Sequence, residues 1–203
     1  NIKLSKKYAT NLSGKNTLKN AETITNNGET THFSVVDSHG NALAITASNN
    51  ANFGSLYASK KLGFLYNTYM DDFIFQDYSH PFAIRPNAMA YSSMSPTIVQ
   101  NNNKNVLVIG SPGSSRIIST VSQITAKWIE NNTITDLTNA PRIHASNNTL
   151  YFEKKKDTVI LEKDFMNKYN LYFKVPSEKL MTKENLNPYY GGVHAIAKEN
   201  GYW

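Results

Sequence analysis

Residues 29–37 read Glu29-Thr30-Thr31-His32-Phe33-Ser34-Val35-Val36-Asp37. Polar and apolar side chains alternate along this run, which predicts a half-buried β-strand. If the chain were cut before Thr30, this residue would carry both a nucleophilic hydroxyl and a free α-amine. Such an amine acts as the general base for its own hydroxyl, so no histidine or aspartate partner is needed. By itself the motif more often marks a structural threonine, and we expect His32 to be packed or surface-exposed.

The pattern on either side of this strand predicts hairpins followed by helices. Residues 38–41 form a turn signal between two alternating segments, so 31–47 is predicted to be a β-hairpin. Apolar residues recur at helical spacing from Ile117 to Trp128, which predicts a helix of about four turns. Together the segments indicate an α+β fold with helices packed on sheets. The other predicted elements are strands at 62–66, 95–100, 105–110, 150–153, 171–175 and 193–198, a helix at 157–169, and an irregular connection over 76–93.

Composition excludes several classes of protein. The chain has 203 residues, of which 40% are hydrophobic, and it has no cysteine. A substantial core can therefore form, whereas thiol nucleophiles, disulfides and thiolate metal sites are excluded. No apolar run approaches about 20 residues, so no membrane span is predicted. The net charge is +6, but the lysines are scattered and indicate a solvated surface rather than a nucleic-acid partner. The histidines lack paired ligand spacing, so no metal site is expected.

Residues 1–29 differ from the rest of the chain. They are rich in Asn, Thr and Lys and show no sustained hydrophobic period. Such a composition is typical of an exposed leader. We therefore expect a polar leader over 1–29 and a globular domain over 30–203.

Three further groups carry residues suited to chemistry. Ser48 and Asn50 follow the first hairpin, where they can hold a carboxylate or simply form a polar turn. Asp72 follows another aspartate and Ser92 precedes another serine; these pairs indicate either an ion-binding site or solvated loops. The run 110–116 reads Gly-Ser-Pro-Gly-Ser-Ser-Arg and leads into the predicted helix. It suits an oxyanion hole, an ordinary serine N-cap, or both, and lacks the lysine of a phosphate loop.

The order of these motifs resembles the small subunit of the γ-glutamyltranspeptidases. The resemblance runs from about Thr30 to the end of the chain and depends on seven blocks in the right order. The blocks are Thr30-Thr31-His32-Phe33-Ser34-Val35-Val36-Asp37, Gly40-Asn41, Phe53-Gly54-Ser55, Met70-Asp71-Asp72-Phe73, Ser92-Ser93-Met94-Ser95-Pro96-Thr97-Ile98-Val99, Gly110-Ser111-Pro112-Gly113 and Asn139-Ala140-Pro141-Arg142.

The resemblance implies an N-terminal nucleophile hydrolase, which is a four-layer αββα sandwich. It also implies autoproteolysis of the Glu29–Thr30 bond. Residues 1–29 would then be the C-terminal tail of a large subunit, and 30–203 a catalytic small-subunit domain with an incomplete C-terminus. The implied partner is the large subunit of the same precursor, no cofactor is implied, and the expected location is periplasmic, secreted or at the cell surface.

The family further implies ping-pong transfer or hydrolysis of γ-glutamyl amides such as glutathione, with an amine or water as acceptor. The nucleophile would be Thr30, supported by the hydroxyl of Ser48, and the oxyanion would bind the N–H groups of Gly113 and Ser114. The implied substrate-binding residues are Asn50, Ser92 and Ser93 for the α-carboxylate and Asp72 for the α-ammonium, with Tyr69 beside it.

Among the departures from the family pattern, those at Tyr69 and Ser114 leave alternatives open. Tyr69 stands where the family usually has Gln or Glu for the α-ammonium. Ser114 replaces a glycine, which costs about 1 kcal/mol or more if φ is positive there. One alternative is therefore a related amidase or acylase, or a poly-γ-glutamate hydrolase, of the same fold. Another is a non-catalytic relative in which the Glu29–Thr30 bond is never cleaved.

Overall fold

The computed structural model describes residues 30–130, 133–146, 149–153, 172–174 and 187–203. The predicted leader over 1–29 and the predicted helix over 157–169 lie outside these residues and stay predictions. The described elements are β1 (Thr30–Val36), β2 (Ala42–Ser48), η1 (Tyr69–Asp72), β3 (Thr97–Asn101), β4 (Lys104–Gly110), α2 (Arg116–Ile129), α3 (Ile134–Thr138), β5 (Ile143–Ser146), β6 (Thr149–Phe152), β7 (Tyr172–Lys174), η3 (Pro188–Tyr190) and β8 (His194–Ala197).

The predicted hairpin over 31–47 is confirmed as β1 and β2. The two strands pair antiparallel, with Thr30 opposite Ser48 at one end and Val36 opposite Ala42 at the other. The turn is closed by Asp37, whose carboxylate accepts hydrogen bonds from the backbone N–H groups of His39 at 2.8 Å and Asn41 at 2.9 Å. This turn fixes the register and thereby places Thr30 at the opposite end of the hairpin.

The second predicted hairpin forms β3 and β4, and β8 adds to the free side of β4. All three strands are antiparallel, in the order β3-β4-β8. Asn102 and Asn103 join β3 to β4 with φ values of 49° and 59°. Asparagine tolerates this left-handed geometry, which suits the two-residue turn of a hairpin.

Strand β4 is buried on both faces. Leu107, Val108 and Ile109 are each fully shielded from solvent, as expected for a continuous apolar run between two layers. On one face the ring of His32 lies directly against Gly110, where any Cβ would overlap it. His32 is therefore a packed residue, as predicted, and its ring bonds the hydroxyl of Thr46 at 2.7 Å. Burial lowers the pKa of His32, and nearby His194 adds to this effect.

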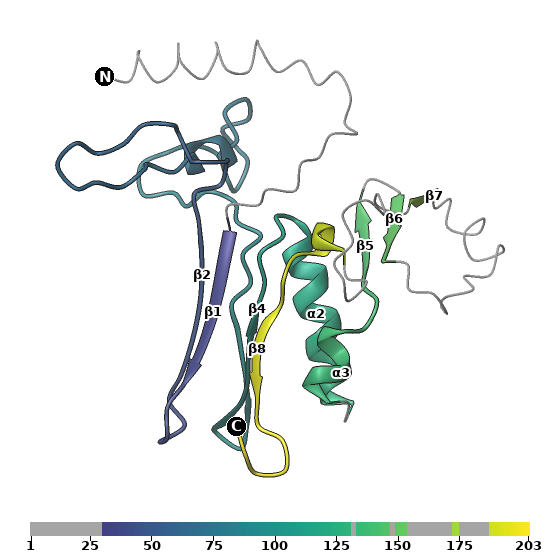
Figure 1. The fold of residues 1–203 in the computed structure, drawn as a ribbon. Coiled ribbons are helices and arrows are strands. Elements are labelled where there is room, and N and C mark those ends of the chain that lie inside the picture. The colour runs from purple at the N-terminus through teal and green to yellow at the C-terminus, as the bar shows by residue number, and fades with distance from the viewer. Residues whose placement is uncertain (1–29, 131–132, 147–148, 154–171, 175–186) are drawn as a thin grey trace.

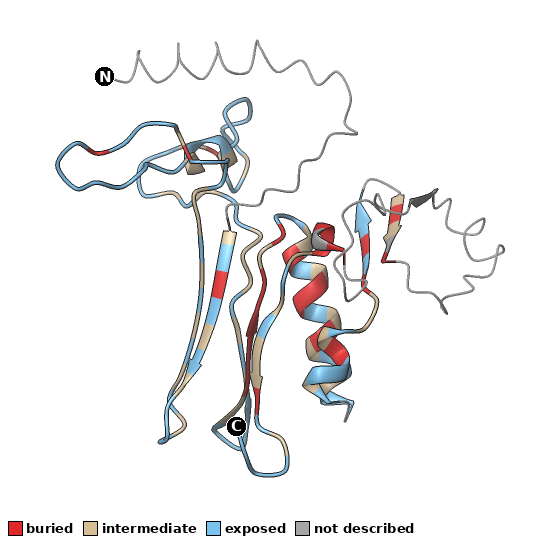
Figure 2. Ribbon diagram, viewed as in Figure 1, coloured by how far each residue is buried: buried red, intermediate tan, exposed pale blue. Residues whose placement is uncertain are grey.

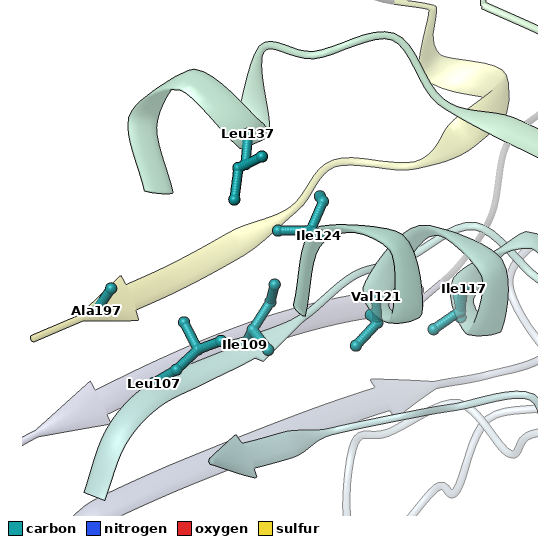
Figure 3. Packing of buried hydrophobic residues seen from close by; sticks show 7 residues of the cluster. All are labelled: Leu107, Ile109, Ile117, Val121, Ile124, Leu137 and Ala197. Carbon is teal, nitrogen blue, oxygen red and sulfur yellow. The ribbon is translucent and has the colours of Figure 1, made fainter. Parts of the chain in front are cut away.

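Helix α2 covers the other face of β4. Ile117, Val121 and Ile124 recur at helical spacing and pack against Leu107 and Ile109 (Figure 3). The helix predicted from Ile117 to Trp128 is therefore confirmed. The cluster is completed by Leu137 of α3 and Ala197 of β8.

The described residues thus form a hairpin layer, a sheet layer and a helix layer (Figure 1). This arrangement confirms the α+β prediction. Most of β1 and β2 is pale blue or tan in Figure 2, although β1 also contains the buried His32, and the outer face of the hairpin is exposed. Phe33, Val35, Leu43 and Ile45 lie on that face and are 36–48% exposed.

A third sheet lies beside α2 and contains β5, β6 and β7. The predicted strands 150–153, 171–175 and 193–198 are confirmed as β6, β7 and β8, and 76–93 lacks helix and strand segments as predicted. The strand predicted at 62–66 is wrong. This segment forms a tight turn with one isolated bridge, between Ala58 and Leu65, because its backbone bonds close a local loop instead of joining a sheet.

An ion pair is buried where β5 and β6 meet the segment before β8. Arg142 and Glu153 are 3% and 2% exposed and form two hydrogen bonds of 2.7 Å. The same carboxylate accepts the backbone N–H of Asn187 at 2.6 Å, and Arg142 Nη1 donates to the carbonyl of Gly191 at 3.2 Å. The pair therefore ties the β5–β6 hairpin to residues 187–191.

Candidate active site

A small cavity of about 130 Å³ lies where five parts of the chain meet. These parts are the first residue of β1, the end of β2, the η1 turn, the loop before β3 and the start of α2. Eight of the predicted site residues line it: Thr30, Ser48, Asn50, Tyr69, Asp72, Ser92, Ser93 and Ser114. Gly113 precedes Ser114 in the chain but does not line the cavity, and Glu29 lies outside the described residues.

The hydroxyl of Thr30 is held by the hairpin register. Because Thr30 and Ser48 are directly opposite in the ladder, their side chains share one face. Thr30 Oγ1 donates to Ser48 Oγ at 3.0 Å, and Ser48 Oγ also accepts the backbone N–H of Asn50 at 2.9 Å. Ser48 therefore orients the hydroxyl of Thr30 at the wall of the cavity.

Asn50 and Asp72 form a polar corner of the cavity. Asn50 has a φ of 70°, and its side-chain amide donates to Asp72 Oδ2 at 3.1 Å. Burial raises the pKa of the Asp72 carboxyl, nearby Asp71 adds to the rise, and the bond from Asn50 opposes it. A cation bound here would favour the charged carboxylate, so the corner suits an ammonium group.

The two adjacent serines reach the cavity from the loop before β3. Ser93 Oγ donates to the carbonyl oxygen of Ser114 at 2.9 Å, and Ser92 Oγ accepts the backbone N–H of Met94 at 3.2 Å. Ser93 therefore links this loop to the turn before α2. Two hydroxyl groups on one wall can bind a carboxylate through neutral hydrogen bonds.

The turn before α2 contains two consecutive residues with positive φ. Gly113 and Ser114 have φ values of 135° and 56°, so both lie in the left-handed region. For Ser114 the positive φ costs about 1 kcal/mol or more. Ser115 is the N-cap residue of α2, but its side chain makes no capping hydrogen bond. The serine-cap alternative is therefore wrong: Ser115 already has helical backbone angles, at φ −57° and ψ −21°, whereas a capping residue is usually non-helical so that its side chain can accept an N–H of the first turn.

One wall of the cavity is aromatic and apolar. The hydroxyl of Tyr69 donates to Met94 Sδ at 3.5 Å. Sequence reasoning missed four lining residues, which are Tyr91, Met94, Ser115 and Ile117. Tyr91, Met94 and Ser115 are each next to a predicted site residue in the chain, and this adjacency is the signal that could have identified them. Ile117 was predicted only as part of the apolar face of the helix.

Other sequence motifs lie away from this cavity. Gly54 packs against the backbone of Tyr66, where a side chain would overlap, so Phe53-Gly54-Ser55 is a structural turn. Asp71 does not line the cavity. The described ranges contain no group of three or more His, Cys, Asp or Glu residues placed to hold a metal ion. None of the helices described is both long and apolar enough to cross a membrane.

Comparison with known proteins places the chain in a structural class. A threonine-to-alanine mutant of Helicobacter pylori gamma-glutamyltranspeptidase superposes with a TM-score of 0.68 and 36% identity, covering 84% of this chain and 92% of that one. The Pseudomonas nitroreducens enzyme complexed with L-DON gives 0.67 and 29%, covering 84% and 90%. The fold is therefore that of the N-terminal nucleophile hydrolases.

The family follows from the sequence match. The family model described as Gamma-glutamyltranspeptidase matches residues 1–203, and the chain belongs to this family. The glutathione hydrolase proenzyme of Escherichia coli is 43% identical over 126 residues, which are 57% of this chain and 22% of that protein. The Pseudomonas aeruginosa proenzyme is 43% identical over 105 residues, or 47% and 19%. The chain spans about a fifth of the length of these curated relatives.

Proposed function

We propose that the protein containing this chain transfers or hydrolyses γ-glutamyl groups, using Thr30 as an N-terminal nucleophile. The observation that carries this proposal is the hydrogen bond between Thr30 Oγ1 and Ser48 Oγ at 3.0 Å. The same cavity is lined by Asn50 and Asp72, a pair suited to bind an ammonium group. Names of the relatives support the substrate class, since they are glutathione hydrolases. Those relatives are also named proenzymes, which supports cleavage of the Glu29–Thr30 bond.

The proposed chemistry is acyl transfer in two steps. The free amine of Thr30 takes the hydroxyl proton, and Oγ1 attacks the γ-carbonyl carbon of the substrate. The developing oxyanion is bound by the N–H groups of Gly113 and Ser114. The amine then protonates the leaving amine, and water or an acceptor amine releases the acyl group from Oγ1. Before the attack, Ser48 holds the hydroxyl of Thr30 in position.

Substrate binding is proposed at the other polar residues that line the cavity. Asn50, Ser92 and Ser93 would bind the α-carboxylate through neutral donors, and Asp72 would bind the α-ammonium. The bond between Asn50 and Asp72 supports this assignment, because it places the two complementary groups at the same corner.

The proposed partner is a large subunit from the same precursor, with residues 1–29 as its tail. The open face of the hairpin supports such a partner, since Phe33, Val35, Leu43 and Ile45 form a contiguous exposed apolar row. Location outside the cytoplasm stays a prediction from the family.

The proposal is tested on the full-length protein. We expect N-terminal sequencing to find a new terminus at Thr30, and the cleaved protein to release p-nitroaniline from γ-glutamyl-p-nitroanilide. Activity in a protein that is intact across Glu29–Thr30 would refute the nucleophile. An uncleaved and inactive protein would support the non-catalytic relative instead.

A second candidate function is a related amidase whose acyl group lacks the α-ammonium. Tyr69 favours it, because its hydroxyl donates to the sulfur of Met94 and it brings no carboxylate or amide oxygen to the cavity. An ammonium group would then be bound by Asp72 without a second acceptor from position 69. Release of p-nitroaniline from glutaryl-p-nitroanilide, which has no α-amine, separates the two functions.

Replacing Tyr69 with glutamine is expected to shift the preference toward the ammonium-bearing substrate. The amide oxygen would add an acceptor beside Asp72, and a hydrogen bond to a charged group contributes about 1.5–3 kcal/mol, or roughly 10–100-fold. The measurement is the ratio of kcat/KM for γ-glutamyl- and glutaryl-p-nitroanilide. Tyr69→Phe is the control, because it removes the hydroxyl without adding an acceptor. An unchanged ratio in Tyr69→Gln would contradict this role.

A further inference from the structure

Residues 189–191, at the end of η3, are held by three polar side chains, two from α2 and one from the residue before β5. Thr120 of α2 is fully buried and donates to the carbonyl oxygen of Tyr190 at 3.1 Å. Arg142 donates to the carbonyl of Gly191 at 3.2 Å, and Arg116 Nε donates to that of Tyr189. The backbone of residues 189–191 is therefore fixed by consecutive hydrogen bonds.

Gly191 brings this segment against the backbone of the turn before α2. It has a φ of 82°, and a Cβ placed on it would overlap the carbonyl of Pro112 and lie 2.7 Å from Ser111 Oγ. On the same side, a Cβ on Gly113 would lie 3.4 Å from Gly191 Cα. The two stretches thus touch backbone to backbone, with no room for a side chain between them.

The other side of this turn faces the cavity. Ser114 lines the cavity together with Thr30, and its carbonyl is bonded by Ser93. The turn is therefore held from the front by Ser93 and from behind by Gly191. Ser114 is a non-glycine residue with a positive φ, a geometry that persists only when its surroundings determine it.

We propose that Gly191 is a positioning residue for the oxyanion-binding turn. It sets the position of the Pro112–Gly113 peptide and thereby aims the N–H groups of Gly113 and Ser114 at the reacting carbonyl. This inference rests on the proposed function. An oxyanion hole acts in the transition state and little in the ground state, so a displaced turn lowers kcat and leaves KM nearly unchanged.

The test compares two adjacent glycines in the full-length protein. Gly191→Ala is expected to lower kcat for γ-glutamyl-p-nitroanilide hydrolysis about 10–100-fold, with KM within about twofold of the parent. Gly192→Ala is the matched control, because a Cβ on Gly192 would meet no atom within 4 Å and its φ lies outside the left-handed region. It is expected to keep kcat within about twofold of the parent value.

A second variant decides the outcome if Gly191→Ala does not fold. Thr120→Val preserves shape but removes the hydrogen bond to Tyr190, so it loosens the same segment and should lower kcat with little change in KM. The inference is overturned if both glycine variants match the parent, or if Thr120→Val leaves kcat unaltered. The proposed function fails differently: the parent protein itself then releases no p-nitroaniline.

Discussion

Thr30→Ala is expected to abolish both self-cleavage and turnover. Under the proposed function, the variant loses the hydroxyl that would attack the Glu29–Thr30 peptide carbonyl and, later, the substrate. Loss of a nucleophile lowers kcat by about 10⁴-fold or more in hydrolases. Mass determination of the subunits and p-nitroaniline release measure the two effects separately.

Thr31→Ala is the matched control for this variant. Thr31 is the same residue type, one position along β1, but it is exposed on the opposite face of the hairpin. We expect it to be cleaved and active. Thr30→Ser should keep both reactions at a reduced rate, because it keeps the hydroxyl. Turnover by Thr30→Ala would show that another group is the nucleophile.

Arg142→Met is expected to lower the free energy of unfolding by about 3–5 kcal/mol. The substitution leaves the fully buried carboxylate of Glu153 without its counter-charge, and uncompensated buried charges are costly. Urea unfolding followed by tryptophan fluorescence or circular dichroism measures the change. The double variant Arg142→Met with Glu153→Gln should recover much of the loss, since the charge is then removed.

Arg85→Met provides the control for Arg142. Arg85 is exposed and donates to the carbonyls of His80 and Pro81 at 3.4 and 3.3 Å. Its replacement should cost less than about 1 kcal/mol. Equal destabilisation by the two variants would mean that the buried pair contributes no more than a surface arginine.

Regular periodicity accounts for the elements that sequence predicted well. The alternation in β1 and the helical spacing of Ile117, Val121 and Ile124 depend on a single buried face, which the sequence displays directly. In contrast, α3 and β5 are short and are fixed by distant partners. Ile134 N at the start of α3 donates to Glu199 Oε1 at 2.7 Å, and Ile143 of β5 exchanges two hydrogen bonds with the side chain of Gln123.

The candidate site was predicted from motif order rather than from spacing. Thr30, Ser48 and Asp72 are far apart in the chain, and no local pattern shows that they share a cavity. Met94 and Tyr91 were missed because their apolar side chains resemble loop packing. The Arg142–Glu153 pair was missed because charged residues are usually exposed, and the sequence does not show that both of these are buried.

The Asp37–Asn41 turn sets the register of the hairpin, so the position of every residue pair is counted from it. Thr30 meets Ser48 because equal numbers of residues run from the turn to each of them. Adding or removing one residue in either arm would swap the two faces of that strand and send one hydroxyl to the outside. Loops beyond Ser48 are under no such rule. During evolution, insertions should therefore accumulate in the 49–96 region and be selected against in the 37–41 turn between β1 and β2.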